Sequence, residues 1–587
     1  MGEFVGIDPL GADKLIRQME AGKDVLGRAR PGLEAAIAEA GEDWAGHEGV
    51  TPMHRTWAFF HESQQDLKWR VDTLKRVVPT QQKGMLTGTL PFSSEADAVQ
   101  AAKRDATAIT EALKHHDQYL SGQSWSEVEK ALAALKGRAD DPAYAATLLT
   151  ALGPEVLEKL FRDWMNTQAK GDRRGLTPDA LKRAADASPG LLARAFASAE
   201  GSGRLGNEWQ KMAETAPSDI LTALVGLAPQ SGTFLNKVAT SLLNRPPNSD
   251  AFPTDPNWNL YNLAKAYEAN PEAFQRLLAE HPKEAGVLLD AYTIRSTGVP
   301  AYEEMLAKAL HGALKPGSGT DDARDRAWLT VINSIGSENS LWVGGSLGTF
   351  ANSPISRMLA QDIKPILDKL ARGQAVRNSP EVPYLKPGPP WDKLDATVSA
   401  RFMGALMQDP AAADTLMKAA KEYTKELDMG RFHPFAPDSY SREAHVNLAE
   451  RTGAMANLLL SGSTYAEWSD DEYAEQIAGY VLMPVDYFNN KYLPIESALV
   501  STGKDKALDD FKDVMKDMIT DYLDKKTPET ADAVANKLVE QQVAFLAESL
   551  KAHGQPPLGA ADRAMMREAI KGRLLSALTE ALRIRGG

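Results

Sequence analysis

The first 80 residues carry the most regular pattern of apolar positions in the chain. After Thr51, apolar side chains recur at alternating intervals of four and three residues, and Gln64 occupies the one polar position in the series. This spacing lines them up on one face of an α-helix, as in helices that pair with another helix. The stripe consists of Met53, Trp57, Phe60, Leu67, Val71, Leu74 and Val78.

A weaker stripe precedes it and predicts a second helix. The stripe is interrupted at Gly22, and the Pro31–Gly32 pair is expected to kink or break the helix. Two such helices, joined by Trp44–Gly49, would fold back as an antiparallel hairpin over residues 1–80. The upstream positions are Leu15, Met19, Leu26, Ala29, Leu33, Ile37, Ala40 and Trp44.

The rest of the chain also has the pattern of helices. Stretches rich in Ala, Leu, Glu, Lys, Gln and Met are broken by Gly and Pro, and strand-like alternation is nearly absent. We therefore predict an all-α fold, with the hairpin followed by helical bundle or helical-array domains. Residues Pro79–Pro91 are expected to form a loop. Linker-like segments predict helical domains over residues 94–312, 323–460 and 461–587.

Three helix starts share one sequence pattern. Asp141-Pro142, Asn270-Pro271 and Asp409-Pro410 each place an Asx residue before a proline, and a leucine follows six residues after the proline. The recurrence is consistent with a divergent internal duplication. The simpler interpretation is that Asx-Pro is a favourable helix start, because the Asx side chain caps the helix and proline suits its first position.

Composition narrows the function classes. Of 587 residues, 43% are hydrophobic and 25% are charged, as in folded globular proteins. The net charge of −13 disfavours general nucleic-acid binding, and the absence of cysteine excludes disulfides and thiolate metal sites. The N-terminus lacks the pattern of a Sec signal, and no apolar run is long enough to span a membrane. We expect a cytoplasmic protein, or one exported without a Sec signal.

The tripeptide Trp44-Ala45-Gly46 lies at the expected turn of the hairpin. Glycine permits the tight turn, and the tryptophan would cover the open end of the helix pair. In this context the segment resembles the WXG family of small helical hairpins that belong to type VII (ESX-like) secretion systems. The resemblance covers the first 80 residues and implies that the hairpin pairs with another helical hairpin.

The chain departs from that family in one respect. The family usually carries a Tyr-x-x-x-Asp/Glu export signal after the second helix, but Gln123 follows Tyr119 at that spacing and Leu148 follows Tyr144. A partner hairpin would then have to supply the signal. Segments such as Asp141–Glu155 also resemble large helical proteins of unknown function in Streptomyces and relatives, which implies an actinobacterial context but no activity.

Candidate catalytic and metal-binding motifs are weak. Gly344–Gly348 fits G-x-S-x-G around Ser346, but a nucleophile elbow requires a strand before the serine, and none is predicted. Glu111 and His115 lie one helical turn apart without a third ligand in view, which favours a solvated polar face. We therefore expect no catalytic residues, no metal and no cofactor.

The chain ends in a basic amphipathic segment that contains Arg563, Arg567, Lys571 and Arg585. It is expected to dock on the protein itself, or else on a partner or an anionic membrane surface. Together these features predict a non-enzymatic helical interaction protein that pairs through Trp44, Gly46 and the Met53–Val78 stripe. The partner would be a helical protein or a second copy. The alternatives are a secreted effector acting on membranes or target cells, and a self-assembling cytoplasmic scaffold.

Overall fold

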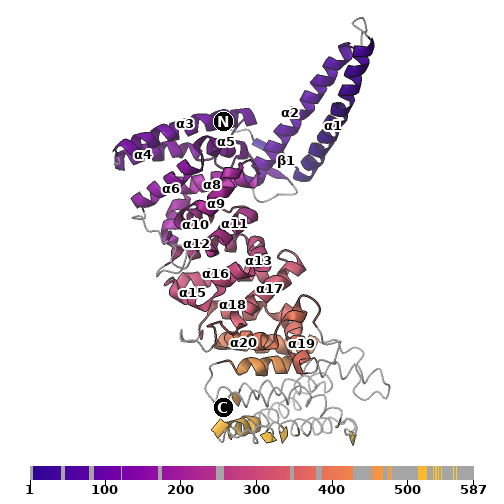
Figure 1. Ribbon diagram of the computed structural model, residues 1–587, viewed down its shortest axis with the longest axis vertical. Helices are drawn as coiled ribbons and strands as arrows, with labels where there is room; N and C mark the ends of the chain where they lie inside the picture. Colours follow the sequence, from indigo (N-terminus) through magenta and orange to yellow (C-terminus); the bar gives the residue numbers. More distant parts are fainter. Residues whose placement is uncertain are drawn as a thin grey trace. The chain divides into compact units, whose positions relative to one another are not determined.

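The computed structural model describes nine continuous segments, residue 451 and, beyond them, only short runs and single residues between 474 and 564. The segments are residues 4–40, 47–77, 85–119, 122–168, 175–245, 257–343, 350–378, 387–426 and 454–466. Within these residues the fold is helical apart from one two-stranded sheet, which confirms the predicted all-α class. Figure 1 shows the order of the elements.

The chain divides into two compact units, residues 1–251 and 252–587. This grouping differs from the expected division into a hairpin and three domains. The expected domain over residues 94–312 crosses the boundary between the units, and the expected linker near residue 315 lies inside the second unit. Each unit is therefore described separately.

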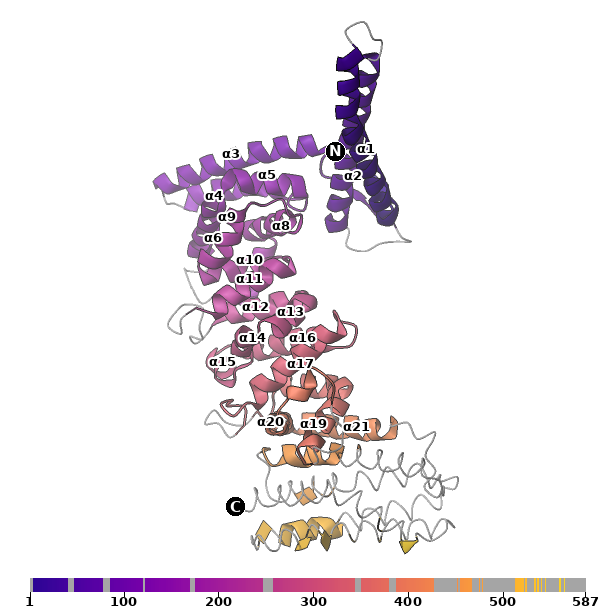
Figure 2. The ribbon, with the colours of Figure 1, turned by 45° about the vertical axis from the view of Figure 1, so that its right-hand side comes forward.

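The predicted hairpin is present in the first unit. Helix α1 spans Pro9–Ala40, helix α2 spans His47–Val77, and the two pack against each other (Figures 1 and 2). Helix α1 continues through Pro31, where a kink or break was expected. Pairing along α2 offsets the loss of one helical hydrogen bond at the proline. Trp44 and Gly46 lie outside the described residues.

A small β-ribbon closes the base of the hairpin, and it corrects the prediction of a loop over Pro79–Pro91. Strand β1 (Phe4–Ile7) pairs antiparallel with β2 (Leu86–Thr89), so that Phe4 lies opposite Thr89 and Ile7 opposite Leu86. Leu86 is buried, whereas Phe4 is exposed. Each strand has only four residues, and its partner is distant in sequence, so local patterns do not reveal it.

The remainder of the first unit is a set of short helices. Helix α3 packs against α4 and α5, helix α5 packs against α8, and α8 packs against α10. These helices are α3 Glu95–Tyr119, α4 Gly122–Leu132, η1 Ala133–Leu135, α5 Pro142–Leu152, α6 Pro154–Gln168, α7 Pro178–Ala185, α8 Ser188–Gly201, α9 Asn207–Thr215, α10 Ser218–Leu227 and α11 Gly232–Leu243.

The second unit is a helical array with two rows of helices. In one row α12, α16, α18 and α21 pack in succession, and in the other α13, α17 and α20 do so. The helices are α12 Trp258–Ala269, α13 Pro271–Glu280, α14 Pro282–Leu289, α15 Ala291–Ser296, α16 Pro300–Leu314, α17 Asp321–Gly336, α18 Pro354–Asp362, η2 Lys364–Ile366, α19 Leu367–Asn378, η4 Trp391–Lys393, α20 Ala396–Met407 and α21 Pro410–Glu426.

The three Asx-Pro sequences all begin helices, namely α5, α13 and α21. The side chain of each Asx residue accepts a main-chain N–H of the first turn, at 2.9–3.0 Å for Asp141, 3.2 Å for Asn270 and 3.0 Å for Asp409. Helix capping thus accounts for the shared pattern without a duplication. The duplication remains a hypothesis.

Asp141 also anchors the hairpin to the rest of the first unit. Its carboxylate is fully buried and accepts hydrogen bonds from Trp69 Nε1 at 2.9 Å and Thr73 Oγ1 at 3.3 Å, both on α2. Burial raises the pKa of Asp141, and the hydrogen bonds from Tyr144 N and Trp69 oppose that shift. One carboxylate therefore caps α5 and holds α2 against it.

Replacing this carboxylate by an amide tests the anchor. In Asp141→Asn, an amide NH2 group replaces one of the two accepting carboxylate oxygens. Because this group cannot accept a hydrogen bond, the donors of either α5 or α2 lose their partner. We expect a loss of about 1–3 kcal/mol in local stability. Hydrogen exchange should accelerate in the second half of α2 and at the start of α5.

Asp409→Asn provides the matched control, because Asp409 is also buried, caps α21 and accepts a 2.8 Å bond from Arg357 of another helix. That change should accelerate exchange around α18 and α21 while α2 keeps its protection. Unchanged exchange of α2 in Asp141→Asn would show that the anchor does not hold the hairpin.

Candidate interaction surface

The predicted stripe faces α1 along most of its length. Met53, Phe60 and Leu67 are half-buried, and the Phe60 ring lies 3.7 Å from where a Cβ would stand on Gly22 of α1. Gln64, the polar member of the series, is buried and donates to the Ile16 carbonyl oxygen at 3.4 Å. The stripe is thus used first to hold the two helices of the hairpin together.

The end of the stripe near the β-ribbon is enclosed by the protein itself. Val71 and Leu74 are buried, and this part of α2 packs against α5 and β2. Helix α5 and strand β2 therefore cover the base of the hairpin. Val78 lies outside the described residues.

The distal part of the hairpin is poorly covered. Among the described side chains of residues 15–39 and 50–66, only Ile37 and Gln64 are buried. Trp57 is 39% exposed and stacks on His61 with a centroid distance of 5.1 Å. Two helices alone therefore leave much of their apolar surface in contact with water.

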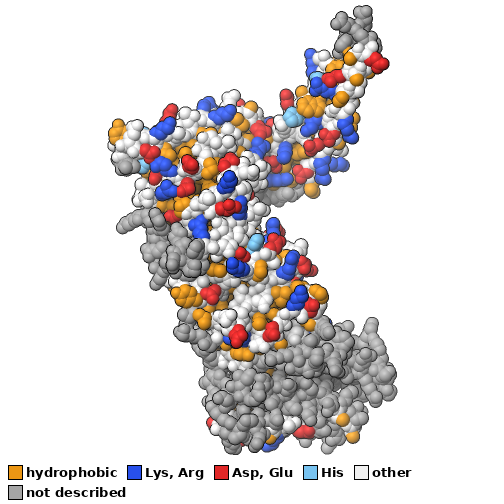
Figure 3. Space-filling view, viewed as in Figure 1, with side chains coloured by type: hydrophobic (Ala, Val, Ile, Leu, Met, Phe, Trp, Pro, Cys, Tyr) orange, Lys and Arg blue, Asp and Glu red, His pale blue; other side chains and the backbone are white. Residues whose placement is uncertain are grey.

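Large exposed apolar side chains gather in this N-terminal region. Of the eleven found among the described residues, seven lie between Phe4 and Met85, although this stretch is a small part of the chain. Phe59 is 63% exposed and Val25 is 58% exposed. Figure 3 shows apolar side chains on the hairpin surface between charged ones. The seven are Phe4, Leu10, Leu15, Val25, Trp57, Phe59 and Met85.

One flank of the hairpin carries a ladder of opposite charges. Lys75 Nζ lies 3.6 Å from Asp13 Oδ2, and His54 Nε2 lies 3.9 Å from Glu34 Oε1. Continuing this antiparallel register in steps of seven residues places Glu20 opposite Lys68 and Gly27 opposite His61. We call this flank the charge ladder: Asp13, Glu20, Gly27 and Glu34 on α1, and His54, His61, Lys68 and Lys75 on α2.

The opposite flank of the distal hairpin is uncharged. His61 follows and Phe59 precedes the inward-facing Phe60, and a turn of about 100° per residue puts them on opposite sides of the seam. The same holds for Gly27 and Val25 around Leu26. We call this flank the distal patch: Gly22, Val25, Ala29, Gly32 and Ala36 on α1, and Thr56, Phe59 and Ser63 on α2. Gly22 and Ser63 are half-buried, and the other six are exposed.

Sequence reasoning located the hairpin but missed the distal patch. Phe59 and Val25 fall outside the stripes that predict the helix pair, although each stands next to a member of a stripe, Phe60 or Leu26. The signal that could have found Val25 is an uncharged series at positions 22, 25, 29, 32 and 36, which shares Ala29 with the upstream stripe and has intervals of three and four residues.

The weak enzymatic and metal motifs gain no support within the described residues. His115 Nδ1 lies 2.9 Å from Glu127 Oε2 of α4. In the described part of the chain no group of three His, Asp or Glu side chains could hold a metal ion. Ser346 and the basic residues Arg563, Arg567, Lys571 and Arg585 lie outside the described residues. No described helix is long and apolar enough to cross a membrane.

Polar pairs in the second unit join neighbouring helices. His311 Nδ1 of α16 lies 2.7 Å from Asp362 Oδ2 of α18, and burial raises the pKa of Asp362 while His311 opposes the shift. Ser353, the cap of α18, donates to Glu303 Oε1 at 2.6 Å. These contacts connect successive helices of one row, so their role is structural.

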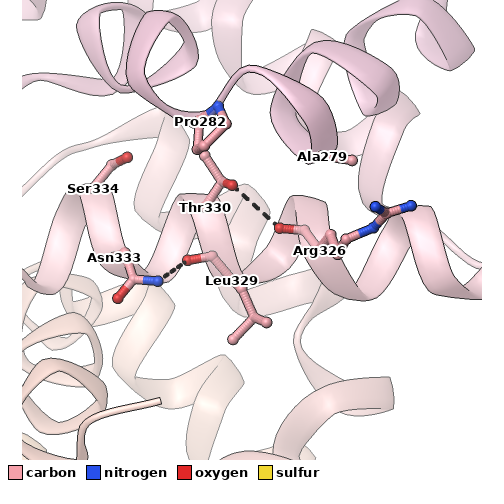
Figure 4. A pocket seen from close by; sticks show the side chains of 7 residues that line it. All are labelled: Ala279, Pro282, Arg326, Leu329, Thr330, Asn333 and Ser334. Carbon is pink, nitrogen blue, oxygen red and sulfur yellow. Dashed lines mark hydrogen bonds between the residues drawn. The ribbon is translucent and has the colours of Figure 1, made fainter. Parts of the chain in front are cut away.

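A shallow hollow in the second unit has a volume of about 400 Å³ (Figure 4). It is lined by Ala279, Pro282, Arg326, Leu329, Thr330, Asn333 and Ser334. Thr330 and Asn333 donate to main-chain carbonyl oxygens of Leu278, Arg326 and Leu329. Arg326 pairs with Asp322 at 2.7 Å, so the polar groups of the hollow are largely engaged by the protein.

Comparison with known proteins gives one partial match. A model described as "Family of unknown function (DUF6571)" matches residues 87–225, from β2 to α10. No curated protein and no solved structure matches the chain. The matched region includes Asp141 and the helices that receive the base of α2, and it leaves out the hairpin.

Proposed function

We propose that this chain is a non-enzymatic helical interaction protein that binds a helical partner through the distal half of its N-terminal hairpin. The observation that carries the proposal is the exposure of three large apolar side chains in the distal half, namely Val25, Trp57 and Phe59. Exposed apolar surface on a folded protein is typical of an interaction site.

The form of the surface favours a helical partner. The distal patch runs along both α1 and α2, and small side chains at Gly22, Ala29 and Ser63 allow another helix to approach closely. A second hairpin on this patch would complete a four-helix bundle, in which each helix buries two sides instead of one.

The setting we propose is a type VII secretion-like system, and the partner is a small two-helix protein encoded beside this chain. The support is the tripeptide Trp44-Ala45-Gly46, which lies in the sequence between the two paired helices. The partner would carry the export signal that the region after α2 lacks.

Co-expression with the two-helix protein of the neighbouring reading frame tests the proposal. Phe59→Asp places a charge in the distal patch without removing a buried contact, because Phe59 is 63% exposed. We expect the complex to weaken by about tenfold or more, as measured by co-purification and titration calorimetry. Circular dichroism should show an unchanged helix content.

Tyr292→Asp is the matched control, since Tyr292 is a similarly exposed aromatic residue (55%) in the second unit. It should leave the complex intact. A complex that is equally stable in both variants would refute a binding role for the hairpin. A homo-oligomer that only Phe59→Asp dissociates, with no second protein, would instead identify a self-assembling scaffold.

A further inference from the structure

The distal patch is bordered by two arginines. Arg28 follows Val25 by three residues on α1, and Arg55 precedes Phe59 by four residues on α2, so each lies beside an exposed apolar residue of the patch. Both arginines are exposed. The patch therefore has a cation on each outer edge. Glu62 borders the patch on α2 one turn closer to the base of the hairpin.

Some cations of the hairpin have a carboxylate partner. Lys75 has a carboxylate of α1 opposite it in the charge ladder, and Arg30 pairs with Glu34 at 2.7 Å. Arg28 donates only to the main-chain oxygen of Asp24 at 3.3 Å. Neither Arg28 nor Arg55 forms an ion pair with a carboxylate in the part of the chain that the structure describes.

We propose, building on the function above, that the partner helix has an apolar seam bordered by Asp or Glu side chains, and that these carboxylates pair with Arg28 and Arg55. Carboxylates suit both positions because guanidinium groups bind them with two parallel hydrogen bonds. The charge ladder faces away from this contact, so the partner approaches from the flank opposite to it.

The same arginines argue against a second copy of this chain as the occupant. When two identical distal patches are placed face to face, each copy offers the single border carboxylate of Glu62 to two border arginines, so one arginine of each copy is left without a carboxylate of the border. An acidic border on another protein gives attraction at the same positions. Charge at the edges of paired helices commonly selects the partner in this way.

Two designed helical hairpins serve as probes. They share one Ala/Leu seam and differ only in border residues, which are glutamates in one and lysines in the other. Binding to the full-length chain is measured by fluorescence anisotropy. We expect the glutamate probe to bind at least about tenfold more tightly, and its affinity to fall as salt rises.

The charge-reversed double variant Arg28→Glu/Arg55→Glu should then prefer the lysine probe. Arg17→Glu is the matched control, because Arg17 also lies on α1 and donates to the main-chain oxygen four residues before it, at 3.3 Å, but lies outside the distal patch. It should keep the preference of the unmodified chain. Equal affinity for both probes, or no reversal in the double variant, would overturn the acidic border.

Phe59→Asp separates this inference from the proposed function. If both probes bind equally and both lose affinity in Phe59→Asp, the hairpin is the binding site but the border charges do not select the partner. If Phe59→Asp leaves the binding of both probes unchanged, or if neither probe binds the unmodified chain, the proposed function itself is contradicted.

Discussion

The main physical constraint on this protein is that two paired helices share a single seam. Each helix buries one stripe against the other, and any apolar residue off that stripe stays in water unless a third element covers it. Near the base of the hairpin, α5 and β2 supply that element and Val71 and Leu74 are buried. Farther out, Phe59 and Val25 remain exposed at 63% and 58%.

The charge ladder makes the two flanks of the hairpin chemically different. Ion pairs between exposed groups contribute little to stability, typically below about 1 kcal/mol each. Their effect here is on position, because the Lys75–Asp13 and His54–Glu34 pairs occupy one flank and keep it polar. The other flank carries the exposed side chains of Val25 and Phe59 without a charged pair, and its small residues would lower the steric cost of approach for the proposed partner.

Local sequence patterns predicted the helices and helix starts, which depend on interactions between residues close in sequence. The apolar spacing after Thr51 located α2, and Asx-Pro sequences located the starts of α5, α13 and α21, because periodicity and capping act within one or two turns. The β-ribbon and the Asp141 anchor join residues more than 60 positions apart. No pattern in either partner reveals such contacts, and Pro31 shows that pairing can also override a local signal.

The anchor and the distal patch occupy different parts of α2, and this separation has a consequence for binding. Trp69 and Thr73 fix the base through Asp141, whereas Phe59 lies almost three turns away. Because α2 is one continuous helix from His47 to Val77, a fixed base holds the distal patch in register. The proposed partner would therefore meet a preformed helix pair and would not have to order it, which lowers the entropic cost of association.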